Sequence, residues 1–147
     1  MDIIGEHRIA APRAAVWAAI FDVETMKACI PGCKELEQTS PTGFAARVQL
    51  KVGPVSATFA GTVELQEIDE PNGCRIVGQG NGGIAGFAKG GSDIRLANEG
   101  EETVLSYAAK VEIGGKLAAL GSRLVQATSR KLVDQFFSAL TERLKPS

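Results

Sequence analysis

Residues 116–144 read KLAALGSRLVQATSRKLVDQFFSALTERL, a stretch with no proline and a single glycine, Gly121. Mostly apolar residues recur in this stretch at helical spacing and would share one side of a helix, while Arg123, Arg130 and Asp134 would lie on the other side. The recurring positions are Leu117, Leu120, Leu124, Thr128, Leu132, Phe136 and Leu140. A helix over this stretch is about 42 Å long. It is too long for a local cap, so we expect it to lie across a sheet.

The middle of the chain predicts that sheet. Between residues 44 and 113, apolar and polar residues alternate in runs that are separated by turn signals, and no helical pattern interrupts them. This spacing is typical of an antiparallel meander, with one face of each strand buried. The predicted strands cover residues 44–52, 57–65, 75–80, 92–98 and 103–113.

The first thirty residues predict a strand followed by two helices. Ile3–Ala10 alternates like a strand, Pro12 suits the first turn of a helix, and Asp22 suits the N-cap of a second, short helix that ends before Pro31. The whole order predicts an α+β fold in one domain, residues 1–147, with a curved antiparallel sheet around a long C-terminal helix.

Composition excludes several classes of protein. The chain has 16 basic and 17 acidic residues, which argues against a nucleic-acid binder. Its hydrophobic content of 44% argues against disorder. It shows no apolar run long enough for a bilayer span and no signal-peptide pattern. We therefore expect a soluble cytoplasmic domain.

The charge is unevenly distributed. Residues 1–115 are net acidic, whereas residues 116–147 carry six basic and two acidic side chains. These basic residues either keep a helix face solvated or contact an acidic partner or an anionic membrane surface. In the second case we expect Arg123 and Arg130, seven residues apart, to share one binding face.

Residues suited to catalysis or metal binding are few. His7 is the only histidine, and strand parity places it on the inner face, as a buried histidine or, with a partner that we do not identify, a general base. We expect no metal site and no covalent cofactor. Cys29, Cys33 and Cys74 suit reduced structural thiols.

A glycine-rich segment follows the predicted strand 75–80. Gly78, Gly80 and Gly83 match G-x-G-x-x-G by letter, but no helix opens after them, so we do not expect a dinucleotide site. We expect residues 80–91 and 114–115 to form mobile loops that flank one opening and gate access.

The candidate site is a cavity. A curved sheet cannot fit flush along a straight helix, so the space between them is either filled by bulky side chains or open. The expected inner faces carry many small residues, and aromatic residues make up only 5% of the chain. These features favour an apolar cavity for a hydrophobic small molecule over a solid core. The expected lining residues are His7, Phe44, Val48, Phe59, Leu105, Tyr107, Leu117, Leu120, Gly121, Leu124, Thr128 and Phe136, and the expected mouth residues are Ile30, Pro31, Gly32 and Phe87.

Several stretches resemble a known family. The order of elements and the segment APRAAVW (11–17) resemble the START-like (SRPBCC) superfamily. The segments CIPGC (29–33), KVGPVSATFAG (51–61) and KLAALGSRL (116–124) resemble the CoxG family of carbon monoxide dehydrogenase subunits. The resemblance covers almost the whole chain and implies the helix-grip fold, which is START-like and Bet v 1-like.

The resemblance also implies a function. It implies a non-catalytic accessory protein for a molybdenum-dependent CO dehydrogenase or a related hydroxylase, acting in membrane recruitment or, with a quinone or lipid in the cavity, in electron transfer. Some members continue into an apolar C-terminal tail, whereas this sequence ends at Ser147, so we expect at most peripheral membrane contact here. Two other hypotheses are an assembly protein with a vestigial cavity and a cyclase- or hydrolase-type enzyme.

Overall fold

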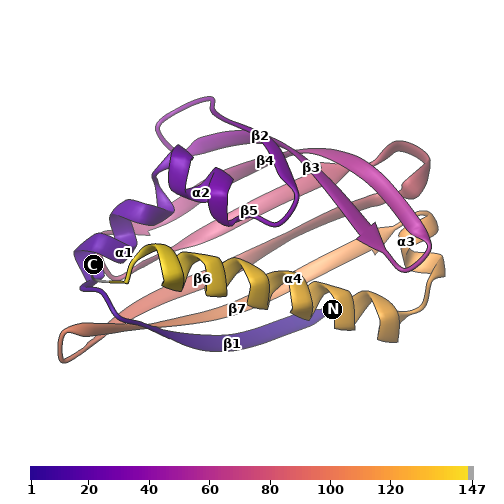
Figure 1. Cartoon of the computed structure of the whole chain (residues 1–147). Coiled ribbons are helices and arrows are strands. Elements are labelled where there is room, and N and C mark those ends of the chain that lie inside the picture. The colour runs from indigo at the N-terminus through magenta and orange to yellow at the C-terminus, as the bar shows by residue number, and fades with distance from the viewer. Residues whose placement is uncertain (146–147) are drawn as a thin grey trace.

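The structure of the chain, a computed structural model, describes residues 1–145. The predicted domain therefore includes two residues, Pro146 and Ser147, that lie outside the described part. A seven-stranded sheet curves around one long helix, and two short helices close one end of the sheet (Figure 1). The elements are β1 (Asp2–Ile9), α1 (Arg13–Ile20), α2 (Val23–Cys29), β2 (Cys33–Gln38), β3 (Gly43–Val52), β4 (Val55–Asp69), β5 (Gly73–Asn81), η1 (Gly83–Ala85), β6 (Phe87–Glu99), β7 (Glu102–Gly114), α3 (Lys116–Ala119) and α4 (Ser122–Arg143).

The strand order confirms the predicted antiparallel meander. The order is β1-β7-β6-β5-β4-β3-β2, so β1 returns to pair with the last strand and every other neighbour is sequential. The sequence analysis missed β2. This edge strand carries charged residues, and its register shifts between Cys33 and Glu35, which breaks the period of two. Such edge strands give a weak hydrophobic signal.

The predicted C-terminal helix is interrupted. Gly121 has a φ of 95°, and it separates the short α3 from α4. The 22 residues of α4 span about 33 Å instead of the expected 42 Å. A left-handed glycine ends a helix readily, because it has no Cβ to clash with the backbone.

The predicted glycine loop is also shorter than expected. β5 continues to Asn81 and β6 begins at Phe87, so most of residues 80–91 belong to paired strands. Only residues 82–86 connect them, with η1 inside the connection. Gly78 and Gly80 are paired in the sheet, and a single 3₁₀ turn, η1, begins at Gly83 instead of the α-helix that a dinucleotide-binding G-x-G-x-x-G motif opens.

The two N-terminal helices form as predicted. The Asp22 carboxylate accepts a hydrogen bond from the Thr25 backbone N–H at 3.1 Å, and this N-cap begins α2. Thr25 donates both hydrogen bonds, from its hydroxyl and its amide, and they lower the pKa of Asp22. Trp17 and Ile20 from α1 pack into the core beneath the sheet.

Candidate functional site

A cavity of about 530 Å³ lies between the sheet and the N-terminal half of α4. Its lining residues are mostly aliphatic or glycine and come from β3 through β7, the α2–β2 loop, α3 and α4. They include Ile30, Pro31, Ala46, Val48, Leu50, Val52, Phe59, Gly61, Val63, Ile76, Gly78, Gly80, Ala88, Gly90, Ala109, Val111, Ile113, Leu117, Val125, Thr128, Ser129 and Leu132. We call this part of the molecule the hollow half.

Small residues in adjacent strands create the sheet wall of the cavity. Gly80 of β5 lies opposite Gly61 of β4 and Ala88 of β6, and Gly78 lies opposite Gly90. Opposite residues in an antiparallel pair share one face, so these positions form a patch without bulky side chains. The register of the sheet therefore opens the space that the helix spans.

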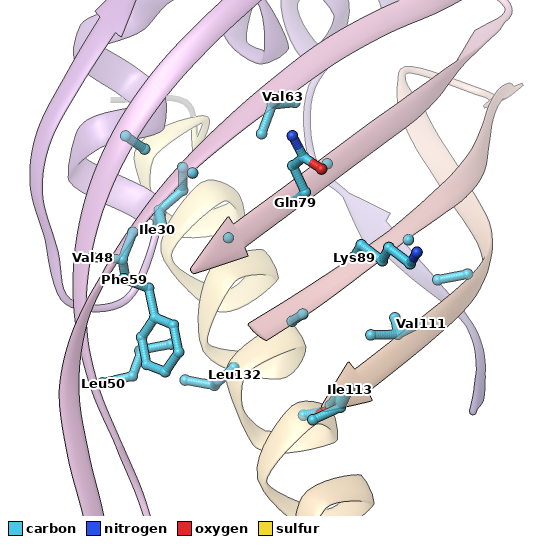
Figure 2. A pocket seen from close by; sticks show the side chains of 18 of the residues that line it. Ile30, Val48, Leu50, Phe59, Val63, Gln79, Lys89, Val111, Ile113 and Leu132 are labelled. Atoms are coloured by element: carbon cyan, nitrogen blue, oxygen red, sulfur yellow. The ribbon is translucent and has the colours of Figure 1, made fainter. Parts of the chain in front are cut away.

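The opposite wall is formed by α3 and α4. Leu117 from α3 and Val125 and Leu132 from α4 line it with apolar side chains. Figure 2 shows Leu132 across from Phe59 and Leu50, which project from the strands. Thr128 and Ser129 are the polar residues on the helix wall, and their hydroxyls can donate to one polar group of a ligand.

Charged groups are nearly absent from this lining. Among the described residues, Lys89 is the one charged member of the lining, and its ammonium group lies 3.5 Å from the Glu112 carboxylate. Within residues 1–145, no group of three or more His, Cys, Asp or Glu side chains could hold a metal ion. The cavity can therefore hold an apolar molecule by contact and orient it through a few hydroxyls.

The structure brings together some of the predicted site residues. Val48, Phe59, Leu117 and Thr128 line the cavity. Of the predicted mouth residues, Ile30 and Pro31 belong to the lining. Gly32 lies beside them in a turn with a φ of 72°, where its carbonyl accepts a hydrogen bond from the Gln49 N–H.

Other predicted lining residues instead fill the opposite part of the space, around the C-terminal half of α4. We call this part the filled half. The His7 ring stacks on Phe137, with centroids 4.4 Å apart, and Tyr107 lies 5.3 Å from Phe137. Leu105 is buried in the same core, and Phe136 packs against it. The rings of His7, Tyr107 and Phe137 therefore pack against one another outside the lining of the cavity.

Burial governs the titration of His7. Desolvation lowers the pKa of His7 below its ordinary value of 6.5; the Asp134 carboxylate opposes this effect and the Arg130 guanidinium adds to it. Because His7 packs against aromatic rings outside the cavity lining, it has no contact with the candidate ligand site.

Three further residues predicted to line the cavity lie elsewhere because the helix is interrupted at Gly121. Leu120 and Gly121 lie at the junction of α3 and α4, and Leu124 covers Gly53 on the β3–β4 turn. None of the three lines the cavity, because the predicted stripe assumed one continuous helix. Within α4, the lining positions are Val125, Thr128, Ser129 and Leu132.

Two aromatic residues, Phe44 and Phe87, do not lie where they were predicted to lie. Phe44 is buried in the main hydrophobic cluster instead of lining the cavity. Phe87 lies one position from the lining residue Ala88, and alternation along β6 places it on the other face, with its ring over Gly114. A shift of one residue along a strand reverses the face.

The basic face predicted for the C-terminal helix is divided. Arg130 is structural, because it donates hydrogen bonds to the Tyr107 hydroxyl at 2.9 Å and to the Ile4 carbonyl at 3.1 Å. Arg143 donates to the Thr25 hydroxyl. The prediction that Arg123 and Arg130 share a free binding face is therefore wrong.

The three cysteines are free thiols. Cys29 and Cys74 are buried, and Cys33 is half-buried at the start of β2. Burial raises the pKa of each thiol, so the neutral form is favoured. They suit packing positions.

Sequence reasoning missed much of the lining. Leu50 and Val52 line the cavity, and the sequence predicts only that they belong to the strand 44–52. Gly78 and Gly80 were noticed as a glycine motif, although their pairing with Gly90 and Ala88 required the register. Leu132 was within the helical stripe, and only its facing strands identify it as a cavity residue.

Solved structures match this arrangement over nearly the whole chain. A conserved protein from Geobacillus kaustophilus is 27% identical, with a TM-score of 0.92 over 98% of this chain and 95% of that chain. A START superfamily protein from Mycobacterium smegmatis is 16% identical, with a TM-score of 0.74 over 97% and 96%. The Zhui aromatase/cyclase from Streptomyces sp. R1128 is 14% identical, with a TM-score of 0.71 over 98% and 93%.

The fold is therefore the helix-grip fold of START-like and Bet v 1-like proteins, as the resemblance implied. No curated protein matches the sequence. In the described part of the chain, no helix combines the length and apolar character that a membrane crossing requires. The sequence model for the carbon monoxide dehydrogenase CoxG family matches residues 5–145. Because this match covers nearly the whole chain, and the fold agrees with it, the chain belongs to the CoxG family.

Proposed function

We propose that this chain is a non-catalytic carrier that holds a hydrophobic small molecule, a quinone or a similar lipid, in the cavity of the hollow half. It serves a molybdenum-dependent CO dehydrogenase or a related hydroxylase. It acts in the cytoplasm and at the inner face of the cytoplasmic membrane, where its ligand dissolves. The cavity is the observation that carries this proposal.

The size and chemistry of the cavity support a ligand. A space of about 530 Å³ lies within the usual 300–1,000 Å³ range of small-molecule pockets. Its lining is dominated by aliphatic side chains and glycine, while Thr128 and Ser129 supply hydroxyls on one wall. An apolar body with one or two hydrogen-bonding groups, as in a quinone or a lipid, fits such a lining.

The placement of ionisable groups supports a non-catalytic role. Acid–base catalysis needs a titratable group within hydrogen-bond reach of the reacting atoms. His7 packs against Phe137 in the filled half, and Lys89 pairs with Glu112. Family membership supports the partner, since the family takes its name from carbon monoxide dehydrogenase.

The direct test is extraction of the purified protein with organic solvent, followed by mass spectrometry, together with titration of the emptied protein with N-phenyl-1-naphthylamine, an apolar fluorescent probe. We expect a co-purified apolar molecule and saturable probe binding that a short-chain quinone displaces. Absence of both would overturn the carrier proposal. Retention of the hydroxylase by a carrier with no ligand would instead support the assembly hypothesis.

A further inference from the structure

Some polar members of the cavity lining direct their side chains away from the cavity. Thr62, Gln79 and Lys89 lie opposite one another on β4, β5 and β6, and Lys89 lies opposite Glu112 of β7. The alternation that places Phe87 on the outer face of the sheet places Lys89 there too, where its ammonium group pairs with the Glu112 carboxylate. These residues therefore bring no side-chain charge into the cavity.

Three hydroxyl-bearing side chains remain on the inner side of the lining. Ser92 of β6 pairs with Ile76 of β5 and with Ala109 of β7, and both neighbours line the cavity. Thr128 and Ser129 lie on the wall that α4 forms. Among the described residues, the polar side chains that face the cavity are therefore neutral hydroxyls.

These hydroxyls are not occupied by protein partners. The hydroxyls of Thr25 and Thr103 donate hydrogen bonds to other groups of the chain. In contrast, no side-chain hydrogen bond within residues 1–145 involves Ser92, Thr128 or Ser129. All three residues are half-buried. Each hydroxyl can donate one hydrogen bond and accept others, so each is available to a ligand.

The hydroxyls lie toward the end of the cavity that meets the filled half. Along β6, the next inward-facing residue after Ser92 is Ile94, which is buried and pairs with Tyr107. Along α4, Ser129 directly precedes Arg130, whose guanidinium donates to the Tyr107 hydroxyl at 2.9 Å. The sheet and the helix thus both place hydroxyls near Tyr107. We call Ser92, Thr128 and Ser129 the hydroxyl pole.

The other end of the cavity is lined by apolar side chains. Val52 ends β3, Ile113 lies near the end of β7, and Leu117 belongs to α3. Ile113 pairs with Ala88, close to the start of β6. Figure 1 shows α3 and the β3–β4 hairpin at the same end of the sheet. The cavity is therefore polar at one end and apolar at the other.

We infer that the hydroxyl pole binds the uncharged, oxygen-bearing head group of a lipid, a carbonyl or a hydroxyl, while the alkyl chain extends toward Leu117. This inference rests on the proposed function and adds the orientation of the ligand and the class that the cavity rejects. An ionised head group would lose its hydration with no cation in the cavity to pair with it, which is costly. The cavity therefore selects neutral lipids over fatty acids.

Displacement of N-phenyl-1-naphthylamine from the emptied full chain tests the hydroxyls with two matched ligands. Decylbenzoquinone has two carbonyl oxygens, and decylbenzene has a similar skeleton without them. The double variant Ser92→Ala, Ser129→Ala should bind the quinone about tenfold more weakly than the parent chain, because one neutral hydrogen bond strengthens binding by roughly twofold to twelvefold. It should bind decylbenzene within about twofold of the parent chain.

A matched variant removes two hydroxyls outside the cavity. Ser106 lies on β7 one position from Tyr107, which places it on the outer face, and Ser138 is exposed on α4. Ser106→Ala, Ser138→Ala should bind both ligands like the parent chain. Thr128→Val keeps the shape of the side chain and should weaken the quinone alone, so it replaces the double variant if that protein does not fold. Unchanged quinone binding, or equal weakening of both ligands, would overturn the inference.

A second pair of ligands tests the rejection of charge. At about pH 8, 1-dodecanol is neutral and dodecanoate is ionised, and their chains are equal in length. We expect 1-dodecanol to bind at least about tenfold more tightly than dodecanoate, because burial of an unpaired carboxylate is unfavourable. Equal affinities would show that the cavity does not select neutral head groups.

The orientation of the ligand has a readout of its own. A nitroxide at the free end of the decyl chain of the quinone should broaden the methyl NMR signals of Leu117 and Ile113 more than that of Ile76, which pairs with Ser92. The reverse pattern would overturn the inference and leave the carrier proposal standing. If neither decylbenzoquinone nor decylbenzene displaces the probe, the carrier proposal fails and this inference fails with it.

Discussion

One sheet and one helix enclose two regions of opposite character. In the filled half, His7, Tyr107 and Phe137 stack between β1, β7 and α4, and Leu140 is fully buried beside them. In the hollow half, glycine and alanine from five strands face Val125 and Leu132, and a cavity of about 530 Å³ remains. The backbone architecture is continuous through both regions, so side-chain size determines where the cavity lies.

The division assigns separate tasks to the two regions. Aromatic stacking in the filled half supplies the packing that holds α4 on the sheet. The hollow half contributes less packing and therefore depends on the filled half for its shape. Changes to the filled half should act on stability, and changes to the hollow half should act on binding.

The largest expected effect is the loss of a ring from the filled half. Phe137→Ala should lower the free energy of unfolding by about 3–5 kcal/mol, because it leaves a cavity beneath the His7 ring. Leu132→Ala should cost about 1–2 kcal/mol, since Leu132 is half-buried and already borders open space. Urea denaturation measures both, and equal losses would contradict the division.

The next prediction fills the hollow half. A Cβ at Gly78 would meet its nearest atom, the Thr62 carbonyl oxygen, at 3.4 Å, which is an ordinary contact. Gly78→Leu should therefore fold, occupy part of the cavity and weaken binding of N-phenyl-1-naphthylamine about tenfold, or about 1.4 kcal/mol. Stability should stay level or rise, because the new side chain is buried.

Gly90→Ala is a control for Gly78→Leu, because the two glycines are paired but differ in the space around them. A Cβ at Gly90 would lie 2.2 Å from the Lys110 carbonyl oxygen, so even a methyl group should destabilise the sheet. Probe fluorescence and thermal unfolding together separate the two outcomes. Full probe affinity in a stable Gly78→Leu protein would show that the ligand lies elsewhere.

A smaller effect concerns pH and the filled half. The pKa of His7 is lower in the folded chain than its ordinary value of 6.5, so the unfolded chain binds this proton first as the pH falls. His7 therefore contributes stability above about pH 6.5 that is lost as the pH falls toward the pKa of the folded chain. His7→Phe keeps a stacked ring but cannot titrate.

Urea denaturation of both proteins from neutral pH to about pH 5 isolates this contribution. The parent chain should lose more stability than His7→Phe over that range. Parallel pH profiles would mean that the folded environment leaves the proton affinity of His7 unchanged.

The smallest expected effect on binding comes from replacing the two thiols beside the hollow half. Cys33→Ser together with Cys29→Ser should keep probe affinity within a few-fold, because neither thiol lines the cavity. Stability should fall by about 1–3 kcal/mol, because the serine at position 29 buries a hydroxyl. A folded variant that no longer binds the probe would give the thiols a role in the site.

The division also explains how far the sequence predicts the molecule. The alternating runs and the long amphipathic stretch predict the sheet and the helix, because periodicity is a local signal. The helix break at Gly121 was missed, since an isolated glycine does not show whether its φ is positive. Local spacing gives no information on strand register.

Register is what positions the site. The sequence predicts that His7 and Tyr107 face inward. It does not predict that the Phe137 ring packs against both of them. It shows Gly78 and Gly90 as separate glycines, and their pairing across β5 and β6 opens the cavity. Contacts with residues distant in the sequence therefore determine whether an inward-facing residue lines the cavity or belongs to the core.

Arg130 has a further consequence for how the chain behaves beside copies of itself. β1 is an outer strand of the sheet, and Ile4 on it is 69% exposed, so this strand presents an apolar side chain and an unpaired backbone edge. Such edges recruit strands from other molecules. The Arg130 guanidinium donates a hydrogen bond to the Ile4 carbonyl at 3.1 Å. A strand added from another copy would compete with the guanidinium for this acceptor, so the residue that fastens the helix also opposes edge-to-edge pairing at Ile4.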